Sequence, residues 1–244
     1  MKLPPMIGVT VVTPAYNHLE KDAVARFKKH TGLPVKVIRC KDADGFKAKL
    51  ELDQQCPRTR IVFFDVDLWL LRSMDPLKNW SPYVWMAVND RAVFNMHAFP
   101  HTDCGSHQMN KLRYFNSGLI GLNLALPQHR AVFKEARRLR KLVLSKKMKA
   151  PVDVTDQFYL NKAVQNLNIG QAMMPEKFNF YMKSADWGQS PCIPREIVGL
   201  HAAGEPLKRK LEALRQQAAV FERSTGPMLE EAAFNNHNMI FDQR

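Results

Sequence analysis

The sequence predicts an α/β fold, an open and mostly parallel sheet flanked by helices, with a helical tail at the C-terminal end. Strand and helix patterns alternate through the first 64 residues, which is the order that builds parallel sheets. Residues 61–64 (IVFF) are fully apolar, as expected of a strand buried on both faces. Hydrophobic residues make up 45% and charged residues 24%, so the chain has an ordinary globular composition.

The early elements follow from short patterns and their breakers. Residues 8–13 (GVTVVT) are β-branched and end at a proline, which indicates a buried strand. The next segment has apolar residues at helical spacing and stops at Gly32. The elements expected after the first strand are a helix at 18–30, a strand at 33–38, a helix at 44–55 and a strand at 61–64.

The later elements are expected as three strands, at 83–88, 117–123 and 197–200, and three helices, at 128–144, 155–165 and 206–221. No internal repeat, low-complexity linker or composition break is evident. We therefore expect one domain over residues 1–244, with the tail beginning at about residue 206.

The chain is strongly basic, with 36 Lys and Arg against 23 Asp and Glu, a net charge of +13. Such a surface attracts polyanions, whether nucleic acid, an anionic membrane or a diphosphate ligand. The aromatic residues do not interleave with the basic runs and no RNA-binding pattern is present, so nucleic acid is the least favoured of these partners.

The cysteines and the apolar segments suggest a cytoplasmic location. The four cysteines show no C-x-x-C spacing, so neither a zinc cluster nor a disulfide framework is expected. The apolar stretch at 7–12 is too short for a signal sequence, and no segment approaches the ~18 apolar residues of a membrane span. We expect a soluble protein or one attached peripherally to a membrane.

The sharpest feature is a pair of aspartates, Asp65 and Asp67, in an otherwise apolar run after the strand at 61–64. In an extended segment, residues two apart point to the same face, so both carboxylates can reach one cation. Two buried and unpaired negative charges are costly, and oxygen ligands suit Mg²⁺ or Mn²⁺. The alternative is that Asp65 caps a turn and Asp67 pairs with a Lys or Arg.

Four motifs follow one another along the chain. They are Asp65-Val66-Asp67, then FNSGLIGLN at residues 115–123, then Asp156-Gln157, then His201-Ala202-Ala203-Gly204. Their order and spacing resemble the nucleotide-sugar glycosyltransferases of the GT-A fold, and most closely glycosyltransferase family eight, the galactosyltransferase and glycogenin-like group. The resemblance covers about residues 9–208 and implies a Rossmann-like sheet of GT-A type.

The resemblance implies that Asp65, Asp67 and His201 hold Mn²⁺ or Mg²⁺ on the diphosphate of a nucleoside diphosphate sugar, most simply a UDP-sugar. The alternative for His201 is an ordinary hydrogen-bonded histidine at the end of a strand. The end of the first strand matches the place where the family holds the nucleoside, which assigns Thr13 and Tyr16 to donor binding.

Further donor contacts are carried over in the same way. Lys49 falls where the family usually has a basic residue that contacts the donor. Asn116 and Ser117 match the turn that lines the donor-sugar pocket, where Gly118 allows the backbone to approach closely. For each of these, a purely structural role is the alternative.

The reaction centre is assigned to Asp156 and Gln157. The resemblance implies that Asp156 accepts hydrogen bonds from sugar hydroxyls and that Gln157 lies against the anomeric face opposite the leaving group. Gly204 and Lys208 are assigned to the diphosphate. Lys208 falls one position later than in the family and no Trp follows, so Arg209 or Lys210 are alternatives.

The family retains the anomeric configuration, and we expect retention here. Asp103 or Asp186 as an inverting base is the alternative. Asp103 lies in a segment, 95–113, that is unlike the family core and carries three histidines and a cysteine. We interpret that segment as an acceptor-side loop rather than a zinc site.

The activity expected is transfer of the sugar to an acceptor hydroxyl on a glycan, a lipid-linked molecule or a protein. A metal-dependent nucleotidyltransferase is the rival enzyme, but it should show a third carboxylate and a Gly-rich phosphate loop. A non-enzymatic nucleic-acid-binding protein is the rival of another class. The basic helix at 130–149 is either a solvated face or a surface attracted to anionic membrane.

Overall fold

A computed structural model describes residues 3–77, 79–89, 113–148, 155–181, 197–202 and 207–225. The predicted α/β fold is confirmed. Within these residues, six strands form a central sheet in the order β2-β1-β3-β6-β5-β7. The strands are β1 (Met6–Val12), β2 (Val35–Arg39), β3 (Arg60–Phe64), β5 (Trp85–Asn89), β6 (Phe115–Asn123) and β7 (Gln171–Met174).

The sheet is mainly parallel because β6 alone runs against the other five strands. β1 pairs in parallel with β2 and β3, and β5 pairs in parallel with β7, whereas β6 is antiparallel to both β3 and β5. The start of β6 therefore lies at the same edge as the end of β3. The Asp65 N–H donates to the carbonyl oxygen of Gly118 at 2.8 Å, which fixes the segment after β3 against the start of β6.

A second, three-stranded sheet has the order β4-β9-β8, with β4 at Leu68–Leu70, β8 at Phe180–Tyr181 and β9 at Gly199–His201. β4 and β9 pair antiparallel with Leu68 opposite His201. The Ala202 N–H continues the pairing onto the carbonyl oxygen of Asp67 at 3.0 Å. This register places His201, from the C-terminal part of the chain, next to Asp65 and Asp67.

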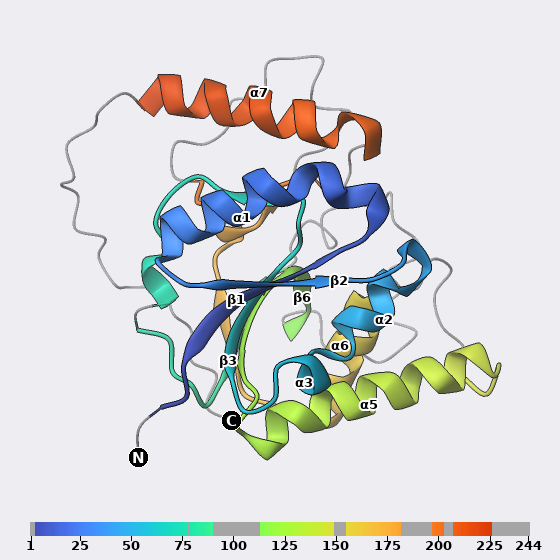
Figure 1. The fold of residues 1–244 in the computed structure, drawn as a ribbon. Helices are drawn as coiled ribbons and strands as arrows, with labels where there is room; N and C mark the ends of the chain where they lie inside the picture. The colour runs from blue at the N-terminus through green and yellow to red at the C-terminus, as the bar shows by residue number, and fades with distance from the viewer. Residues whose placement is uncertain are drawn as a thin grey trace.

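Helices cover both faces of the central sheet (Figure 1). α1 and α7 lie on one side, and α5 and α3 lie on the other, with α6 also packed against α5. The helices are α1 (Asn17–Thr31), α2 (Gly45–Lys49), α3 (Leu52–Gln55), α5 (Pro127–Leu144), α6 (Asp156–Asn166) and α7 (Leu207–Thr225).

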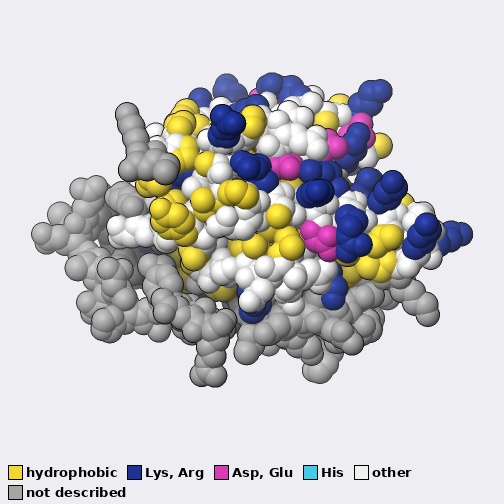
Figure 2. All heavy atoms as spheres, turned by 90° about the horizontal axis from the view of Figure 1, so that it is seen from below, with side chains coloured by type: hydrophobic (Ala, Val, Ile, Leu, Met, Phe, Trp, Pro, Cys, Tyr) yellow, Lys and Arg dark blue, Asp and Glu magenta, His cyan; other side chains and the backbone are white. Residues whose placement is uncertain are grey.

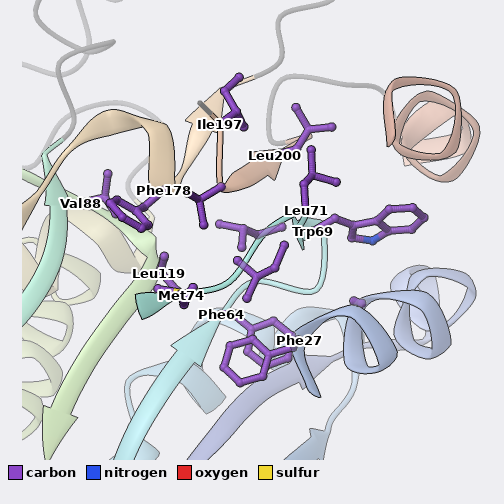
Figure 3. Packing of buried hydrophobic residues seen from close by; sticks show 14 of the residues in the cluster. Phe27, Phe64, Trp69, Leu71, Met74, Val88, Leu119, Phe178, Ile197 and Leu200 are labelled. Atoms are coloured by element: carbon purple, nitrogen blue, oxygen red, sulfur yellow. The ribbon is translucent and has the colours of Figure 1, made fainter. Parts of the chain in front are cut away.

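The core is divided by the sheet into two clusters. Alternation along β3 sends Val62 and Phe64 to the cluster under α1 and α7, and Ile61 and Phe63 to the cluster under α5 and α6. Figure 3 shows the first cluster, in which the ring of Phe27 from α1 stacks on Phe64 with centroids 4.0 Å apart. Both apolar faces of the sheet are thus covered, as a mainly parallel sheet requires.

Most expected elements are present, with bounds that differ by a few residues. The expected helix at 44–55 is instead two short helices that break after Lys49. Ala48, Lys49, Leu50 and Leu52 are all buried, and one straight helix cannot turn that many adjacent positions inward. The break lets Lys49 point toward the sheet edge while the leucines pack under α5. The sequence analysis did not predict β4, β7 and β8.

The expectation about membrane spans, and the expectation about two of the four cysteines, can be compared with the described residues. Among the described residues, no helix combines the length and the apolar character needed to span a bilayer. Cys40 and Cys56 are free thiols, whereas Cys104 and Cys192 lie outside the described residues.

Candidate functional site

A cavity of about 440 Å³ opens at the edge of the central sheet where β1 and β3 end and β6 begins. A volume of this order accommodates a nucleotide-sized ligand. Ligands bind outside the carboxyl ends of strands in open α/β sheets, which is where this cavity lies. The residues predicted from the sequence that line it are Thr13, Tyr16, Lys49, Asp65, Asp67, Asn116, Ser117, Asp156, Gln157 and His201.

Lys49 is a buried cation that joins three elements of the site. Its Nζ lies 3.0 Å from Asp65 Oδ1 and 2.9 Å from Asp156 Oδ2, and it donates to Ser117 Oγ at 3.1 Å. Burial opposes its charge, but Asp156 and Asp65 outweigh that effect and raise the pKa of Lys49. The ammonium is therefore charged in the folded protein and neutralises two carboxylates at once.

Asp67 is paired with two groups that come from the C-terminal part of the chain. Lys210, from the first turn of α7, donates to Asp67 Oδ2 and to the carbonyl oxygen of Ala202. His201 Nε2 lies 3.3 Å from Asp67 Oδ1. Burial opposes ionisation of Asp67, yet His201 and Lys210 together hold its pKa well below the usual range.

Asp65 is the more open of the two aspartates, with 30% of its side chain exposed toward the cavity. Burial raises the pKa of Asp65, and Asp67 and Asp156 add to that rise, while Lys49 and His201 act against it. The two carboxylates thus differ: Asp67 is held firmly as an anion, and Asp65 gains most from a further positive charge.

Asp65, Asp67 and His201 fit a divalent metal. Each aspartate uses one oxygen for a lysine and turns the other, Asp65 Oδ2 and Asp67 Oδ1, toward His201 Nε2 at 3.8 and 3.3 Å. The three ligand atoms lie within 4.8 Å of one another. The salt links that were the alternative interpretation of the acids therefore exist, but they leave one face of each carboxylate for a cation. Two carboxylates and an imidazole are a donor set that suits a divalent metal ion.

Gly118 keeps the space between these three residues open. A Cβ at this position would lie 2.6 Å from His201 Cε1 and 2.9 Å from Asp65 Oδ2. Any side chain there would push the imidazole and the carboxylate out of place. The neighbouring Asn116 is held by its Oδ1, which accepts from the Gly118 N–H at 2.7 Å and from Asn179 Nδ2 at 2.6 Å.

The first turn of α6 faces the start of β6 and completes the cavity wall. Asp156 Oδ2 accepts from Ser117 Oγ at 2.8 Å, and Gln157 Oε1 accepts from the Ser117 N–H at 3.0 Å. Asn161, one turn further along α6, anchors the helix by accepting the Phe115 N–H and donating to the Phe115 carbonyl. These bonds hold Asp156 and Gln157 side by side at the cavity.

The turn after β1 forms a further part of the cavity wall, and the ring centroid of Tyr16 lies 5.8 Å from Lys210 Nζ. Asp42 Oδ1 accepts the Ala15 N–H at 3.0 Å, and this bond together with one from the Thr13 hydroxyl lowers the pKa of Asp42. Burial is the main cause of a raised pKa at the half-buried Tyr16, so its phenol stays neutral. Phe46 of α2 also lines the cavity, and 57% of its surface is exposed.

Lys210, Asp42 and Phe46 line the cavity but were not assigned to it from the sequence, although Lys210 was an alternative to Lys208. Lys210 is 4% exposed and lies inside the site, whereas the predicted Lys208 is exposed on α7. Lys208 remains a prediction, and Gly204 lies outside the described residues. Asp42 and Phe46 had no motif to mark them, and Asn179 acts only through its contact with Asn116. For Lys210, the run of three basic residues at 208–210 was the available signal.

Asp156 is a third carboxylate near the metal group, a feature expected of a nucleotidyltransferase. Its Oδ2 is bound to Lys49 and Ser117, and Asp156 is not in the group whose ligand atoms all lie within 4.8 Å of one another, which is Asp65, Asp67 and His201. The turn after β1, Thr13 to Tyr16, contains no glycine and so is not a Gly-rich phosphate loop. The segment 95–113, apart from Arg113, and both Asp103 and Asp186 lie outside the described residues.

Solved structures with the same fold are glycosyltransferases. The chain aligns to the bifunctional glycosyltransferase WbbM with a TM-score of 0.64 at 15% identity, over 90% of this chain and 52% of WbbM. It aligns to the galactosyltransferase LgtC with a TM-score of 0.58 at 15% identity, over 92% of this chain and 97% of LgtC. For the glycosyltransferase GlyE of Streptococcus pneumoniae TIGR4, the TM-score is 0.53 at 14% identity, over 92% of this chain and 63% of GlyE.

The chain thus spans about half the length of WbbM and nearly the whole of LgtC. No protein-family model matches the sequence, and no curated protein matches it. The similarity is therefore one of fold, and it agrees with the resemblance seen in the four motifs. The chain has the GT-A fold of these nucleotide-sugar glycosyltransferases.

Proposed function

We propose that the chain is a metal-dependent glycosyltransferase of the family-eight type, which transfers a sugar from a nucleoside diphosphate sugar, a UDP-sugar, to an acceptor hydroxyl. One observation carries the proposal. In a cavity at the strand ends of a GT-A fold, the ligand atoms of Asp65, Asp67 and His201 lie within 4.8 Å of one another. Lys49 and the first turn of α6 adjoin that group in the same cavity.

The charges of the site suit a metal and a diphosphate together. Three buried or half-buried aspartates, Asp65, Asp67 and Asp156, face two buried lysines, Lys49 and Lys210. One negative charge remains, which attracts a dication more than a free diphosphate. A bound Mn²⁺ or Mg²⁺ supplies the positive charge that offsets the diphosphate leaving group as the glycosidic bond breaks.

The protein groups bind and orient the donor along the cavity. Thr13 and Tyr16 form the part of the wall proposed for the nucleoside, and the ring of Tyr16, with Lys210 Nζ 5.8 Å from its centroid, is the aromatic proposed to stack on the base. Lys210 reaches the metal group from α7 and is placed to hold the diphosphate, in the role first assigned to Lys208. Lys49, Asn116 and Ser117 form the wall proposed for the donor sugar.

Asp156 and Gln157 face the proposed sugar site from the first turn of α6. In this proposal Asp156 accepts hydrogen bonds from sugar hydroxyls, and its contact with Lys49 keeps it ionised for that task. Gln157 is held by the Ser117 N–H and lies against the anomeric face opposite the leaving group. A neutral amide there cannot deprotonate an incoming acceptor as an inverting base would, and in this proposal the anomeric configuration is retained. The acceptor is a glycan, a lipid-linked molecule or a protein.

The test is release of nucleoside diphosphate from a panel of nucleotide sugars with Mn²⁺, with and without simple glycoside acceptors. Asp67→Asn keeps the shape of the side chain and removes its charge, and we expect it to lose at least about 100-fold in turnover. Asp22→Asn on α1 is the matched control, since it removes a half-buried carboxylate that is paired with Arg215 outside the cavity.

Thermal unfolding with each nucleotide sugar measures binding without turnover, because a ligand of the native state raises Tm. UDP-sugars with Mn²⁺ should raise the Tm of the wild-type chain and of Asp22→Asn, but not of Asp67→Asn. Full activity in EDTA, or equal activity of Asp67→Asn and Asp22→Asn, would refute the metal role. No Tm shift with any nucleotide sugar would refute the donor class.

A further inference from the structure

α5 and the turn that follows it carry an unbalanced positive charge. Residues 127–148 contain eight Lys and Arg and a single acid, Glu135, a net charge of +7 in a chain of +13. α1 and α7 carry net charges of +2 and +3 over comparable lengths. More than half of the excess charge of the protein is therefore concentrated on one helix and its C-terminal turn.

The arginines and the lysines of this segment are used differently. Arg137 binds both oxygens of Asp53, Arg138 binds Glu135, and Arg130 donates to the carbonyl oxygen of Leu124. Four lysines, by contrast, are exposed and have no ion pair with any described carboxylate. This set, called here the α5 lysine patch, is Lys134, Lys141, Lys146 and Lys147.

The patch lies along the outer side of the helix. Val132, Phe133, Ala136 and Leu139 are buried on the opposite side, which fixes which face is turned outward. Figure 2 shows this face of the molecule, with Lys and Arg side chains gathered where α5 extends and few acidic side chains among them. An 18-residue helix is about 27 Å long, so the charges form a stripe rather than a point.

We propose that the α5 lysine patch is a docking surface for an anionic lipid bilayer. Lysines are hydrated point charges on flexible stems and suit a plane of diffuse negative charge, whereas three of the four fork-shaped arginines of this segment, Arg130, Arg137 and Arg138, are bound within the protein. Leu144, 65% exposed at the end of the helix, supplies an apolar side chain to enter the interface.

The composition of the patch argues against nucleic acid as the partner. Phe133 is the one aromatic of residues 127–148 and it is buried, so this surface has no exposed ring on which bases could stack. Docking through α5 also keeps the cavity near the membrane. Thr155 lies at the cavity wall and follows Lys147 by eight residues, so the chain can separate the two residues by at most about 28 Å.

The experiment is co-sedimentation of the full chain with vesicles of phosphatidylcholine, with and without phosphatidylglycerol. The patch variant is K134Q/K141Q/K146Q/K147Q. The matched control, K21Q/K28Q/K29Q/R223Q, removes the same number of exposed charges from α1 and α7. Each basic residue at an anionic surface raises binding about fivefold, so the patch variant should bind at least about 25-fold more weakly if half of its lysines touch the surface.

The wild-type chain and the control variant should bind anionic vesicles alike and release them as salt screens the charges, with a screening length falling from about 10 Å at 0.1 M to about 3 Å at 1 M. Equal weakening of both variants would refute the patch as the site. So would a lack of binding at low salt, or binding to single-stranded RNA but not to vesicles. Vesicle binding does not require turnover, so its failure leaves the proposed enzyme activity untouched.

Discussion

The two long helices in the C-terminal half of the described chain, α5 and α7, lie on opposite faces of the sheet and use their charges in opposite ways (Figure 1). α7 pairs with α1 through Arg215 with Asp22 and Glu222 with Arg26, and it buries Lys210 against Asp67. α5 binds three of its four arginines locally, and the α5 lysine patch is exposed. Lys210 and Arg215 of α7 therefore belong to the site and the fold, whereas the lysines of the patch are available to a partner.

The comparison shows that net charge alone does not locate function. Both helices are amphipathic and basic, and from the sequence alone attraction to anionic membrane was an alternative to a solvated face for the basic helix at 130–149. The two helices differ in the acids that they meet. Asp22 of α1 pairs with Arg215 of α7, and Glu222 of α7 pairs with Arg26 of α1, whereas Asp53 is the one acid from another described element that pairs with α5. Substitutions in the two helices can test whether the cations of α7 are paired while the lysines of α5 are free for a partner.

The largest effect is expected for Lys210→Met. This change leaves Asp67 buried with one charged partner fewer, and breaking a buried ion pair costs about 3–5 kcal/mol of unfolding free energy. Lys208→Met on the exposed side of the same turn should change stability by less than about 0.5 kcal/mol. Urea denaturation measures both variants.

A double variant separates the lost pair from a simple loss of packing. Adding Asp67→Asn to Lys210→Met removes the unpaired charge, so the double variant should recover most of the lost stability. If Lys210→Met and Lys208→Met behave alike, α7 does not anchor the site and the contrast with α5 fails.

Lys210 also shows how far the sequence could predict the site. The resemblance carried by the four motifs marked residues that the structure brings to one cavity, among them Asp65, Asp67 and His201, and each lies at a strand end or a helix start. Lys210 lies on a helix whose direction relative to the site depends on how α7 packs against α1, through residues far apart in the chain. The spacing of the family motif therefore assigned the diphosphate contact to Lys208 instead of Lys210.

The fold was predictable to a similar degree. Buried strands such as β3 are marked by their own apolar run, so the first half of the sheet and the large helices were expected. β4 is only three residues, and it is a strand because it pairs with β9, some 130 positions later. The reversal of β6, which brings Asn116 and Ser117 to Asp65, likewise depends on non-local pairing that no local pattern shows.

The second effect concerns His129 on the buried side of α5. Its Nδ1 accepts the Asn123 N–H at 2.9 Å, and burial lowers the pKa of His129 to about 4. The unfolded chain has a histidine pKa of about 6.5, so above that pH both states are neutral and the full stability is present. As the pH falls from 6.5 to 4 the unfolded state takes up a proton first, and about 3 kcal/mol is lost.

His129→Asn keeps an acceptor near the Asn123 N–H and removes the titration. Urea denaturation between pH 4 and 7 should show a shallower loss of stability on acidification for this variant than for wild type. His30 on α1 also has a pKa lowered to about 4 by burial, so the comparison with the variant isolates the contribution of α5. Parallel pH profiles for the two proteins would mean that His129 is not held neutral.

A third, smaller effect compares one arginine from each helix. Arg137 of α5 binds Asp53 with two hydrogen bonds and also donates to the Leu50 carbonyl at 2.7 Å, largely out of solvent. Arg137→Met should cost about 2 kcal/mol. Arg215→Met of α7 removes an ion pair whose arginine is 61% exposed and should cost about 0.5 kcal/mol, less in high salt. A larger loss for Arg215→Met would mean that the surface pairs, not the buried lysine, attach α7.

The smallest effect has the opposite sign. Lys146 ends the turn after α5 with φ of 56°, a left-handed conformation in which a lysine side chain is strained and glycine is not. Lys146→Gly should therefore stabilise the fold by about 0.5–1 kcal/mol in urea denaturation while weakening binding to anionic vesicles about fivefold. Lys147→Gln removes the same charge from a neighbour without positive φ, so it should weaken vesicle binding equally and leave stability unchanged. If Lys146→Gly gains stability but binds vesicles as well as wild type does, Lys146 is not part of the docking surface. The lysines of α5 would then differ from the cations of α7 only in their exposure to solvent.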